Sequence, residues 1–193
     1  MGLIPKRIIS IWLGSGIPPV VMDCLLTHTQ ENYERLFISN DNYLKGIPYV
    51  EECIAAKQYV KASDYLRIYY LFQVGGIYLD ADIKIMKSFD DLLDKGMFVG
   101  REENGFIANS VIGTPPGNPI LKEYLGIVDR NFKGGGELVF EPGMEAWSNI
   151  IKKHGEVTVF PPEYFFPYNH EKNTTNITNN THTYHYFLKT WKL

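Results

Sequence analysis

One segment, residues 62–82 with the sequence ASDYLRIYYLFQVGGIYLDAD, constrains the fold of this chain more than any other. Apolar side chains recur in it at intervals of three and four residues, which predicts a helix with one face against a core. The members of that face are Ala62, Tyr65, Leu66, Tyr69 and Phe72. Gly75 and Gly76 then stop the helix, and the apolar residues 77–79 predict a short buried strand. The segment therefore predicts a helix that leads directly into a strand of a sheet.

Two aspartates, Asp80 and Asp82, stand at the end of this predicted strand. In extended backbone, side chains two positions apart project to the same side, so the two carboxylates are expected to lie together. Neighbouring carboxylates repel unless a cation lies between them, and a hard divalent ion with a phosphate partner suits them. Open α/β sheets bind ligands at the carboxyl ends of their strands. The position predicts a metal and a phosphorylated ligand, although the triplet alone also fits a solvated turn.

Three polar side chains share one face of the preceding helix, because Ser63, Asp64 and Arg67 are three and four residues apart. A guanidinium beside aspartates can be a structural ion pair. It can equally bind phosphates and sugar hydroxyl groups, and position does not separate the two roles.

This segment resembles the core signature of the sugar-binding Asp-x-Asp glycosyltransferases. They include glycosyltransferase family 32, capsular polysaccharide transferases, initiating mannosyltransferases and the catalytic domains of clostridial glucosylating toxins. The positions that match are Ser63, Asp64, Arg67, Gly75, Gly76, Tyr78, Asp80 and Asp82. The resemblance implies catalytic roles for Asp64, Arg67 and Asp80, and donor binding by Ser63 and Tyr78. It also implies that Asp80 and Asp82 hold a metal ion.

Segments near both ends are similar to the same family. The opening strand and Trp-x-Gly turn in IPKRIISIWLGSGIPP (4–19) imply that Trp12 stacks on the nucleotide base, with core packing as the alternative. The closing motif in HYFLKTWKL (185–193) implies that His185 approaches the metal. It also implies that Lys189, Thr190 and Trp191 lie near the diphosphate. In FIANSVIG (106–113), Asn109 matches a catalytic-site asparagine that faces the donor sugar, with a satisfied amide at a sheet edge as the alternative.

The rest of the chain predicts helices alternating with strands, which is typical of α/β folds. Helices are expected at 18–29, 50–60, 119–128 and 144–153, and a helical turn at 89–93. Strands are expected at 8–13, 35–39, 83–86, 96–100, 106–113 and 157–160. The polar tract 169–183 predicts no fixed fold until a donor binds. The resemblance narrows the fold to a Rossmann-like nucleotide-sugar fold of the glycosyltransferase A type, with a mixed sheet between helices, in one domain (1–193).

Composition restricts the partners and the compartment. The 193 residues suit one domain, and a net charge of −3 without a basic stripe argues against nucleic acid as a partner. Two cysteines, Cys24 and Cys53, are expected to be reduced thiols, and no apolar run reaches the length of a membrane span. We expect a cytoplasmic protein, at most peripheral at the inner membrane face. The oligomeric state is left open.

The reaction that the resemblance implies is transfer of a hexose from a nucleotide-diphosphate sugar to a hydroxyl group, with retention of anomeric configuration. The acceptor would be a carbohydrate or a lipid-linked glycan, in glycan or capsular polysaccharide synthesis. Mn²⁺ or Mg²⁺ would assist departure of the diphosphate. Two alternatives remain: a phosphatase of the haloacid-dehalogenase type, which also uses Asp-x-Asp after a strand, and a catalytically silent sugar-binding relative. The phosphatases usually carry Thr or Val where this chain has Lys84.

Overall fold

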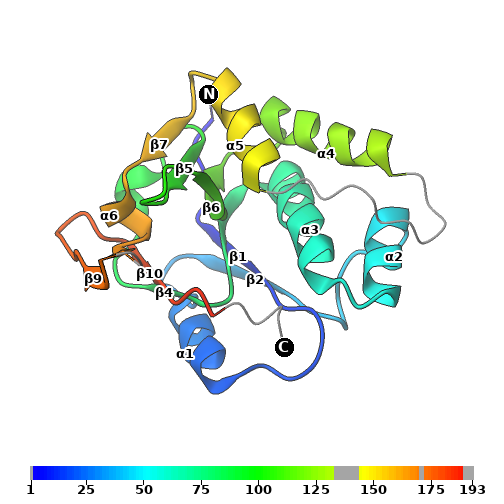
Figure 1. Cartoon of the computed structure of the whole chain (residues 1–193), viewed down its shortest axis with the longest axis horizontal. Helices are drawn as coiled ribbons and strands as arrows, with labels where there is room; N and C mark the ends of the chain where they lie inside the picture. Colours follow the sequence, from blue (N-terminus) through cyan, green and yellow to red (C-terminus); the bar gives the residue numbers. More distant parts are fainter. Residues whose placement is uncertain (1, 133–143, 170–171, 189–193) are drawn as a thin grey trace.

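A mixed sheet with the strand order β2-β1-β3-β6-β5-β7 forms the centre of the computed structural model, which describes residues 2–132, 144–169 and 172–188 (Figure 1). These strands are β1 (Arg7–Ile11), β2 (Glu34–Ile38), β3 (Gly76–Leu79), β5 (Phe98–Arg101), β6 (Ile107–Thr114) and β7 (Thr158–Phe160). Parallel pairs join β1 to β2 and β3, and β5 to β7, whereas β6 is antiparallel to β3 and β5. The mixed α/β architecture expected from the sequence is confirmed.

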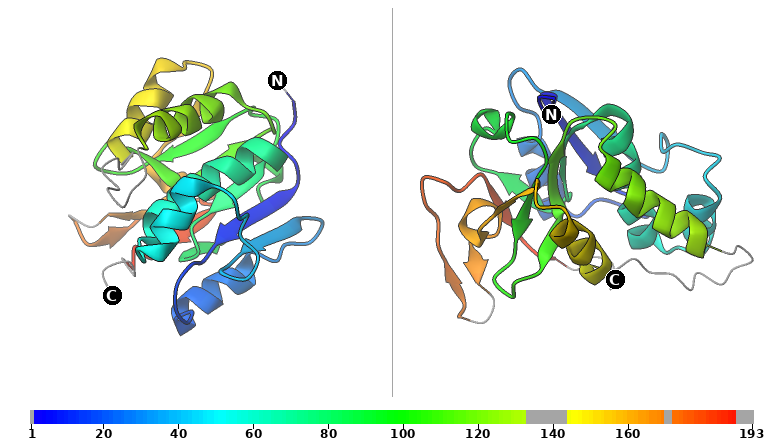
Figure 2. Two further views of the ribbon diagram at one scale, coloured as in Figure 1. Left: turned by 90° about the vertical axis from the view of Figure 1, so that its right-hand side faces the viewer. Right: turned by 90° about the horizontal axis from the view of Figure 1, so that it is seen from above.

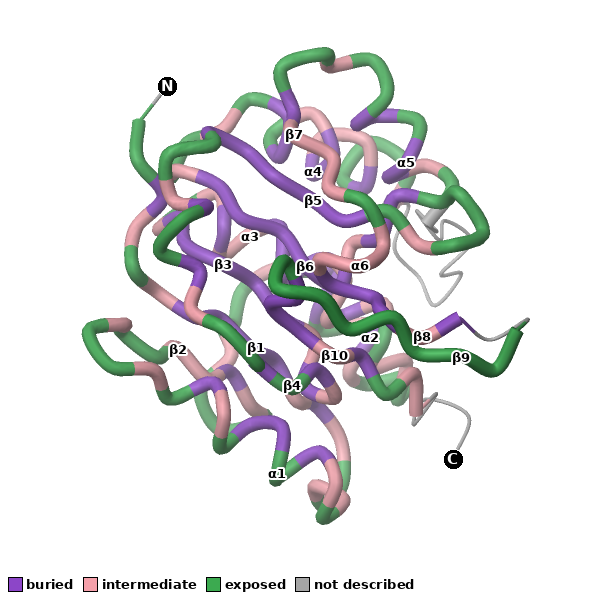
Figure 3. The backbone as a smooth tube through the Cα atoms, turned by 90° about the vertical axis from the view of Figure 1, so that its left-hand side faces the viewer, coloured by how far each residue is buried: buried purple, intermediate pink, exposed green. Residues whose placement is uncertain are grey.

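Four helices cover one face of this sheet: α2 (Pro48–Ala55), α3 (Tyr59–Val74), α4 (Pro119–Asn131) and α5 (Met144–Lys153) (Figures 1 and 2). A second small sheet lies on the other face with α1 (Pro19–Thr27) and the short helix α6 (Pro162–Phe165). A 3₁₀ turn, η1 (Asp90–Leu92), also packs on that side. Strand alternation divides the core between the two faces: Ile77 and Leu79 of β3 pack toward α6, while Tyr78 packs toward α2–α5. The central strands are buried along nearly their whole length (Figure 3).

The sequence predicted one helix at 50–60, but the chain turns within this range. Helix α2 ends at Ala55, and α3 begins at Tyr59. Lys57 adopts a positive φ of 57° there. The predicted apolar face of α3 is confirmed for Ala62, Tyr65 and Leu66, which are buried, while Tyr69 and Phe72 are partly buried at its margin. No helix in the described ranges is long and apolar enough to cross a membrane.

The glycines between α3 and β3 lie where a side chain would not fit. Gly75 has a φ of 62°, and a Cβ there would lie 2.6 Å from the backbone nitrogen of Pro116. Gly76 has a φ of 120°, and its Cβ would lie 2.8 Å from the carbonyl oxygen of Arg7. The positive φ and the lack of space for a Cβ atom both exclude residues larger than glycine. The close contact of α3 with the sheet therefore depends on Gly75 and Gly76.

The polar C-terminal tract is folded in its described part, contrary to the sequence-based expectation. Strand β10 (Thr183–His185) pairs antiparallel with β4 (Ile83–Ile85), and β8 (Tyr168–Asn169) pairs with β9 (Thr174–Thr175). Thr181, His182 and Thr183 are buried, and they bond to the carbonyl oxygens of residues 163, 164 and 165 in or beside α6. The composition of this tract is typical of disorder. It does not reveal that the polar side chains find hydrogen-bond acceptors elsewhere in the folded chain.

Candidate active site

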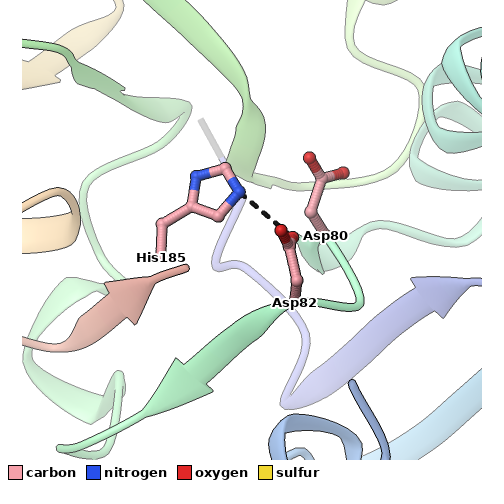
Figure 4. Close-up of side chains that lie close together, drawn as sticks. All are labelled: Asp80, Asp82 and His185. Carbon is pink, nitrogen blue, oxygen red and sulfur yellow. Dashed lines mark hydrogen bonds and ion pairs between the residues drawn. The ribbon is translucent and has the colours of Figure 1, made fainter. Parts of the chain in front are cut away.

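The two aspartates of the Asp-x-Asp motif lie in a tight turn between β3 and β4. The Ile83 N–H donates to the Asp80 carbonyl at 3.1 Å, so the expectation of extended backbone through the motif is wrong. The turn still brings the side chains together. Ligand atoms of Asp80, Asp82 and His185 all lie within 4.8 Å of one another (Figure 4). Since β10 pairs with β4 in the register His185 to Ile83, the strand pairing itself sets the imidazole beside the motif.

Asp82 and His185 form one half of this cluster. His185 Nε2 and Asp82 Oδ1 are 3.1 Å apart, and the Leu188 N–H donates to Asp82 Oδ2 at 3.0 Å. Burial raises the pKa of the Asp82 carboxyl group, but the hydrogen bond and charge of His185 and the Leu188 N–H lower that pKa further than burial raises it. Asp82 is therefore held as a carboxylate, the form that binds a cation.

Arg67 organises the other half. Its guanidinium forms ion pairs with Asp64 at 2.8 Å and with Asp80 at 3.2 Å, while its side chain is only 6% exposed. It also donates to the Asn109 carbonyl oxygen at 3.0 Å, and the Asn109 side-chain amide donates to Asp64 at 3.3 Å. Burial lowers the pKa of Arg67, but the charge of Asp80 and the other nearby acidic groups raise it overall. Three of the predicted residues, Asp64, Arg67 and Asn109, thus meet beside the motif.

Tyr78 lies beneath this network rather than at its surface. Its ring is 1% exposed, the Arg67 guanidinium lies 4.7 Å from its centroid, and its hydroxyl donates to Asp80 Oδ1 at 2.8 Å. Burial raises the pKa of Tyr78 well above its usual value, so the phenol stays protonated. These contacts favour a positioning role for Tyr78 over the predicted contact with the donor, since a central strand turns every second side chain into the core.

The residues of this site fit a divalent cation. Asp64, Asp80 and Asp82 with Arg67 leave a net charge of −2 (three carboxylates and one guanidinium) when His185 is neutral. Asp80 engages Arg67 and Tyr78 through Oδ1, and its Oδ2 has no partner among the described residues. Carboxylate oxygens with one imidazole form a donor set that suits Mn²⁺, and the carboxylates suit Mg²⁺.

Trp12 follows β1 and is half-buried. Its indole N–H donates to the Ser15 carbonyl oxygen at 3.0 Å, and its ring packs against a cluster of Val21, Leu25 and Ala81. Ala81 is the residue between the two aspartates, so Trp12 borders the motif. Ser63 is half-buried on α3, one residue before Asp64. Lys189, Thr190 and Trp191 lie outside the described residues.

His28, at the end of α1, is a site residue that sequence reasoning missed. It is fully buried, with Nδ1 2.5 Å from the Ser10 hydroxyl and Nε2 2.7 Å from the carbonyl oxygen of Ile83. Since a carbonyl oxygen only accepts, Nε2 carries the proton and Nδ1 accepts from Ser10. The imidazole thereby fixes the backbone directly after Asp82. A lone serine inside the apolar run 8–13 was the available signal of a buried polar partner.

We expect the stability of the protein to fall as pH decreases below 6.5 because of His28. Burial, opposed in part by the bond to Ile83, lowers the pKa of His28 from 6.5 to about 4. Between these values the unfolded chain binds more protons than the folded one, so the free energy of unfolding decreases with decreasing pH. Urea unfolding of the wild type and His28→Gln at pH 7, 6 and 5 measures this effect. The variant should show a shallower pH dependence, and identical slopes would contradict the assignment.

The sequence and the fold of this chain are similar to those of glycosyltransferases. Residues 10–99 match the family model described as the glycosyltransferase sugar-binding region containing a DXD motif. That range holds Trp12, α3 and both aspartates. The solved structure of the PaToxG glycosyltransferase shares the fold, with a TM-score of 0.63 and 24% identity over 79% of this chain and 70% of that chain.

Two curated relatives show how much of a larger protein this chain represents. Inositol phosphoceramide mannosyltransferase 2 of Schizosaccharomyces pombe is 28% identical over 142 residues, which are 68% of this chain and 40% of that protein. Toxin Afp18 of Yersinia ruckeri is 35% identical over 97 residues, which are 47% of this chain and 5% of the toxin. The chain therefore spans well under half the length of either relative.

Proposed function

We propose that this chain is a member of the sugar-binding Asp-x-Asp glycosyltransferases, whose family model it matches over residues 10–99, and that it transfers a hexose from a nucleotide-diphosphate sugar to an acceptor hydroxyl group. The observation that carries the proposal is the convergence of Asp80 and Asp82, from the turn between β3 and β4, with His185 from β10. We further propose that residues 1–193 form a single catalytic domain.

Each side chain of the site has a role in this reaction. Asp80, Asp82 and His185 would hold Mn²⁺ or Mg²⁺, which when bound stabilises negative charge on the departing diphosphate. Arg67 holds Asp80 in position from beneath through their ion pair. Asp64 and Asn109, hydrogen-bonded to each other, would contact the donor sugar. Trp12 and Ser63 would contact the nucleotide, and Lys189, Thr190 and Trp191 remain our candidates at the diphosphate.

We propose that the reaction proceeds with retention of anomeric configuration, as the family resemblance implies. In this front-side route, the acceptor enters on the face from which the diphosphate leaves.

The acceptor and the biological setting are also part of the proposal. The mannosyltransferase relative is named for a lipid acceptor and the other relative is a toxin, so the names of these relatives do not agree on an acceptor. We propose a carbohydrate or a lipid-linked glycan, used in glycan or capsular polysaccharide synthesis in the cytoplasm, with a peripheral contact at a membrane when the glycan is lipid-linked.

Hydrolysis of nucleotide sugars tests the proposed function. A panel of UDP-, GDP- and CDP-linked hexoses is incubated with the protein and Mn²⁺ without acceptor, and release of the nucleotide diphosphate is measured. We expect one donor to be cleaved, and EDTA to abolish cleavage until Mn²⁺ is restored. Cleavage of p-nitrophenyl phosphate with no cleavage of any donor would favour a phosphatase. Binding of a donor without cleavage would favour a silent relative.

Trp12→Ala is expected to weaken binding of the cognate nucleotide diphosphate. Loss of an aromatic stack on a base costs about 1–3 kcal/mol, which is roughly a five- to 150-fold rise in Kd. Isothermal titration calorimetry in the presence of Mn²⁺ measures the change, and Trp12→Phe, which keeps a ring, should retain most of the affinity. Unchanged affinity together with a lower melting temperature would instead assign Trp12 to packing against Val21 and Leu25.

A further inference from the structure

A small cavity of about 140 Å³ lies beside the candidate metal site, and none of the roles above uses it. The turn between β5 and β6 contributes Glu102, Glu103 and Asn104 to its wall. Three aromatic side chains, Phe166, Tyr168 and Phe187, also line it. Ligand pockets for drug-sized molecules usually measure roughly 300–1,000 Å³, so this cavity has room for one small ring rather than for a nucleotide.

One aromatic ring separates this cavity from His185. Phe187 stacks on the imidazole, with centroids 3.9 Å apart and planes inclined by 28°. Phe166 contacts both rings, at 5.9 Å from His185 and 6.2 Å from Phe187. Phe187 adopts a φ of 51°, which is uncommon for a bulky residue and is typical of segments held in place at functional sites.

The cavity also lies at the edge of the sheet that carries the motif. The Asp80 N–H donates to the Ser110 carbonyl oxygen at 3.0 Å, and β6 is antiparallel to β3. The residues of β6 before Ser110 therefore run past Asp80 toward the β5–β6 turn. A ligand in the cavity would approach the site beside Asp82 and His185, without crossing the core beneath Arg67.

The wall has the chemistry of a carbohydrate site. Partly exposed rings such as those of Tyr168 and Phe187 can cover the apolar side of a sugar, while carboxylates and amides bond to its hydroxyl groups. Asn169 also lines the cavity, and its amide nitrogen donates to no partner among the described residues. Among the residues that the structure describes, the lining contains two glutamates and no lysine or arginine, so these side chains would repel a phosphorylated ligand.

We propose that this cavity is the acceptor subsite and that it takes a neutral, unphosphorylated sugar residue. The proposal rests on the proposed transferase function and adds the class of acceptor. It places the acceptor on the His185 side of the motif. The two glutamates exclude an inositol phosphate head group from the cavity and admit an uncharged glycan end.

Direct binding of small sugars tests the subsite. Methyl glycosides of glucose, galactose, mannose and N-acetylglucosamine are titrated into ¹⁵N-labelled protein, with Mn²⁺ and either UDP or GDP present or absent. We expect at least one glycoside to shift the amide signals of Asn104 and Asn169. Glu103→Lys should raise its Kd at least about fivefold, a loss of roughly 1 kcal/mol. Glu31→Lys, the same charge change at an exposed position away from the cavity, should leave the Kd unchanged.

An anionic probe completes the experiment. Inositol 1-phosphate should not shift these signals in the wild type, and it should begin to bind in Glu103→Lys. Glu103→Gln, which removes only the charge, should admit the anion less well than Glu103→Lys. Glycoside shifts that are absent with and without nucleotide, or that Glu103→Lys leaves unchanged, would overturn the proposal. The NMR titration requires no turnover. If the protein cleaves no nucleotide sugar, the proposed transferase function is refuted, but the titration still decides whether the cavity binds a glycoside.

Discussion

Asp82→Asn is expected to lower metal-dependent cleavage of the nucleotide sugar by about 10²–10³-fold, the typical cost of losing one group that stabilises transition-state charge. The substitution removes one charge from a cluster with a net charge of −2, so the attraction for a divalent cation falls. Calorimetric titration with Mn²⁺ should show weaker binding or none. The fold should persist, because the loss of like-charge repulsion offsets the weaker contact with His185, and the side-chain amide oxygen of the variant can still accept from the Leu188 N–H.

Asp41→Asn is the matched control for this experiment. Asp41 is exposed in the loop after β2, and the same change there should alter neither Mn²⁺ binding nor cleavage. Full cleavage by Asp82→Asn, measured on protein with a normal melting temperature, would remove the metal assignment.

Arg67→Met is expected to cost about 3–5 kcal/mol of unfolding free energy, the usual penalty for removing one partner of a buried ion pair. The Arg67 side chain is 6% exposed and pairs with Asp64 and Asp80, which would both lose their cationic partner. Cleavage of the donor should also fall, because Asp80 loses the group that holds it. Urea unfolding measures the first effect, and initial rates per folded molecule measure the second.

The double variant Asp64→Asn/Arg67→Met separates pairing from packing. If the penalty arises from an unpaired carboxylate, the double variant should be more stable than the sum of the two single changes predicts. Strict additivity would show that Asp64 and Arg67 do not stabilise each other. A fully active and fully stable Arg67→Met protein would contradict both the positioning role and the donor-binding role.

Local patterns in the sequence predicted those parts of the site that depend on short spacings. Asp64 and Arg67 are three residues apart on a periodic helix, so their ion pair follows from helix geometry. The buried strand before Asp80 follows from an apolar run after two glycines. His185 was reached by resemblance, and the pairing of β10 with β4 supports its placement. The backbone at Asp80 was predicted wrongly, because alternation along a strand does not reveal where the strand ends and a turn begins.

Contacts between distant segments could not be predicted in this way. His28 bonds to Ile83 across 55 positions, and His182 is buried against Phe89 and Tyr164. Neither partner has a sequence spacing that signals the contact. The aromatic wall beside His185 likewise depends on Phe166 and Phe187 meeting in space. Burial of a polar residue depends on acceptors that only the folded chain supplies, so polar composition led to the wrong expectation for the tract 169–183.

The two glycines of the signature have a consequence for reading such motifs in evolution. A side chain at Gly75 or Gly76 would collide with the backbone of Pro116 or Arg7, so selection for a stable fold alone preserves both residues. The carboxylate of Asp82 is under no such steric constraint. A descendant that lost catalysis would therefore keep Gly-Gly, and Asp80 as the partner of buried Arg67, and would be free to change Asp82. Among homologous sequences, the glycines mark inheritance of the scaffold, and Asp82 distinguishes active enzymes from pseudoenzymes.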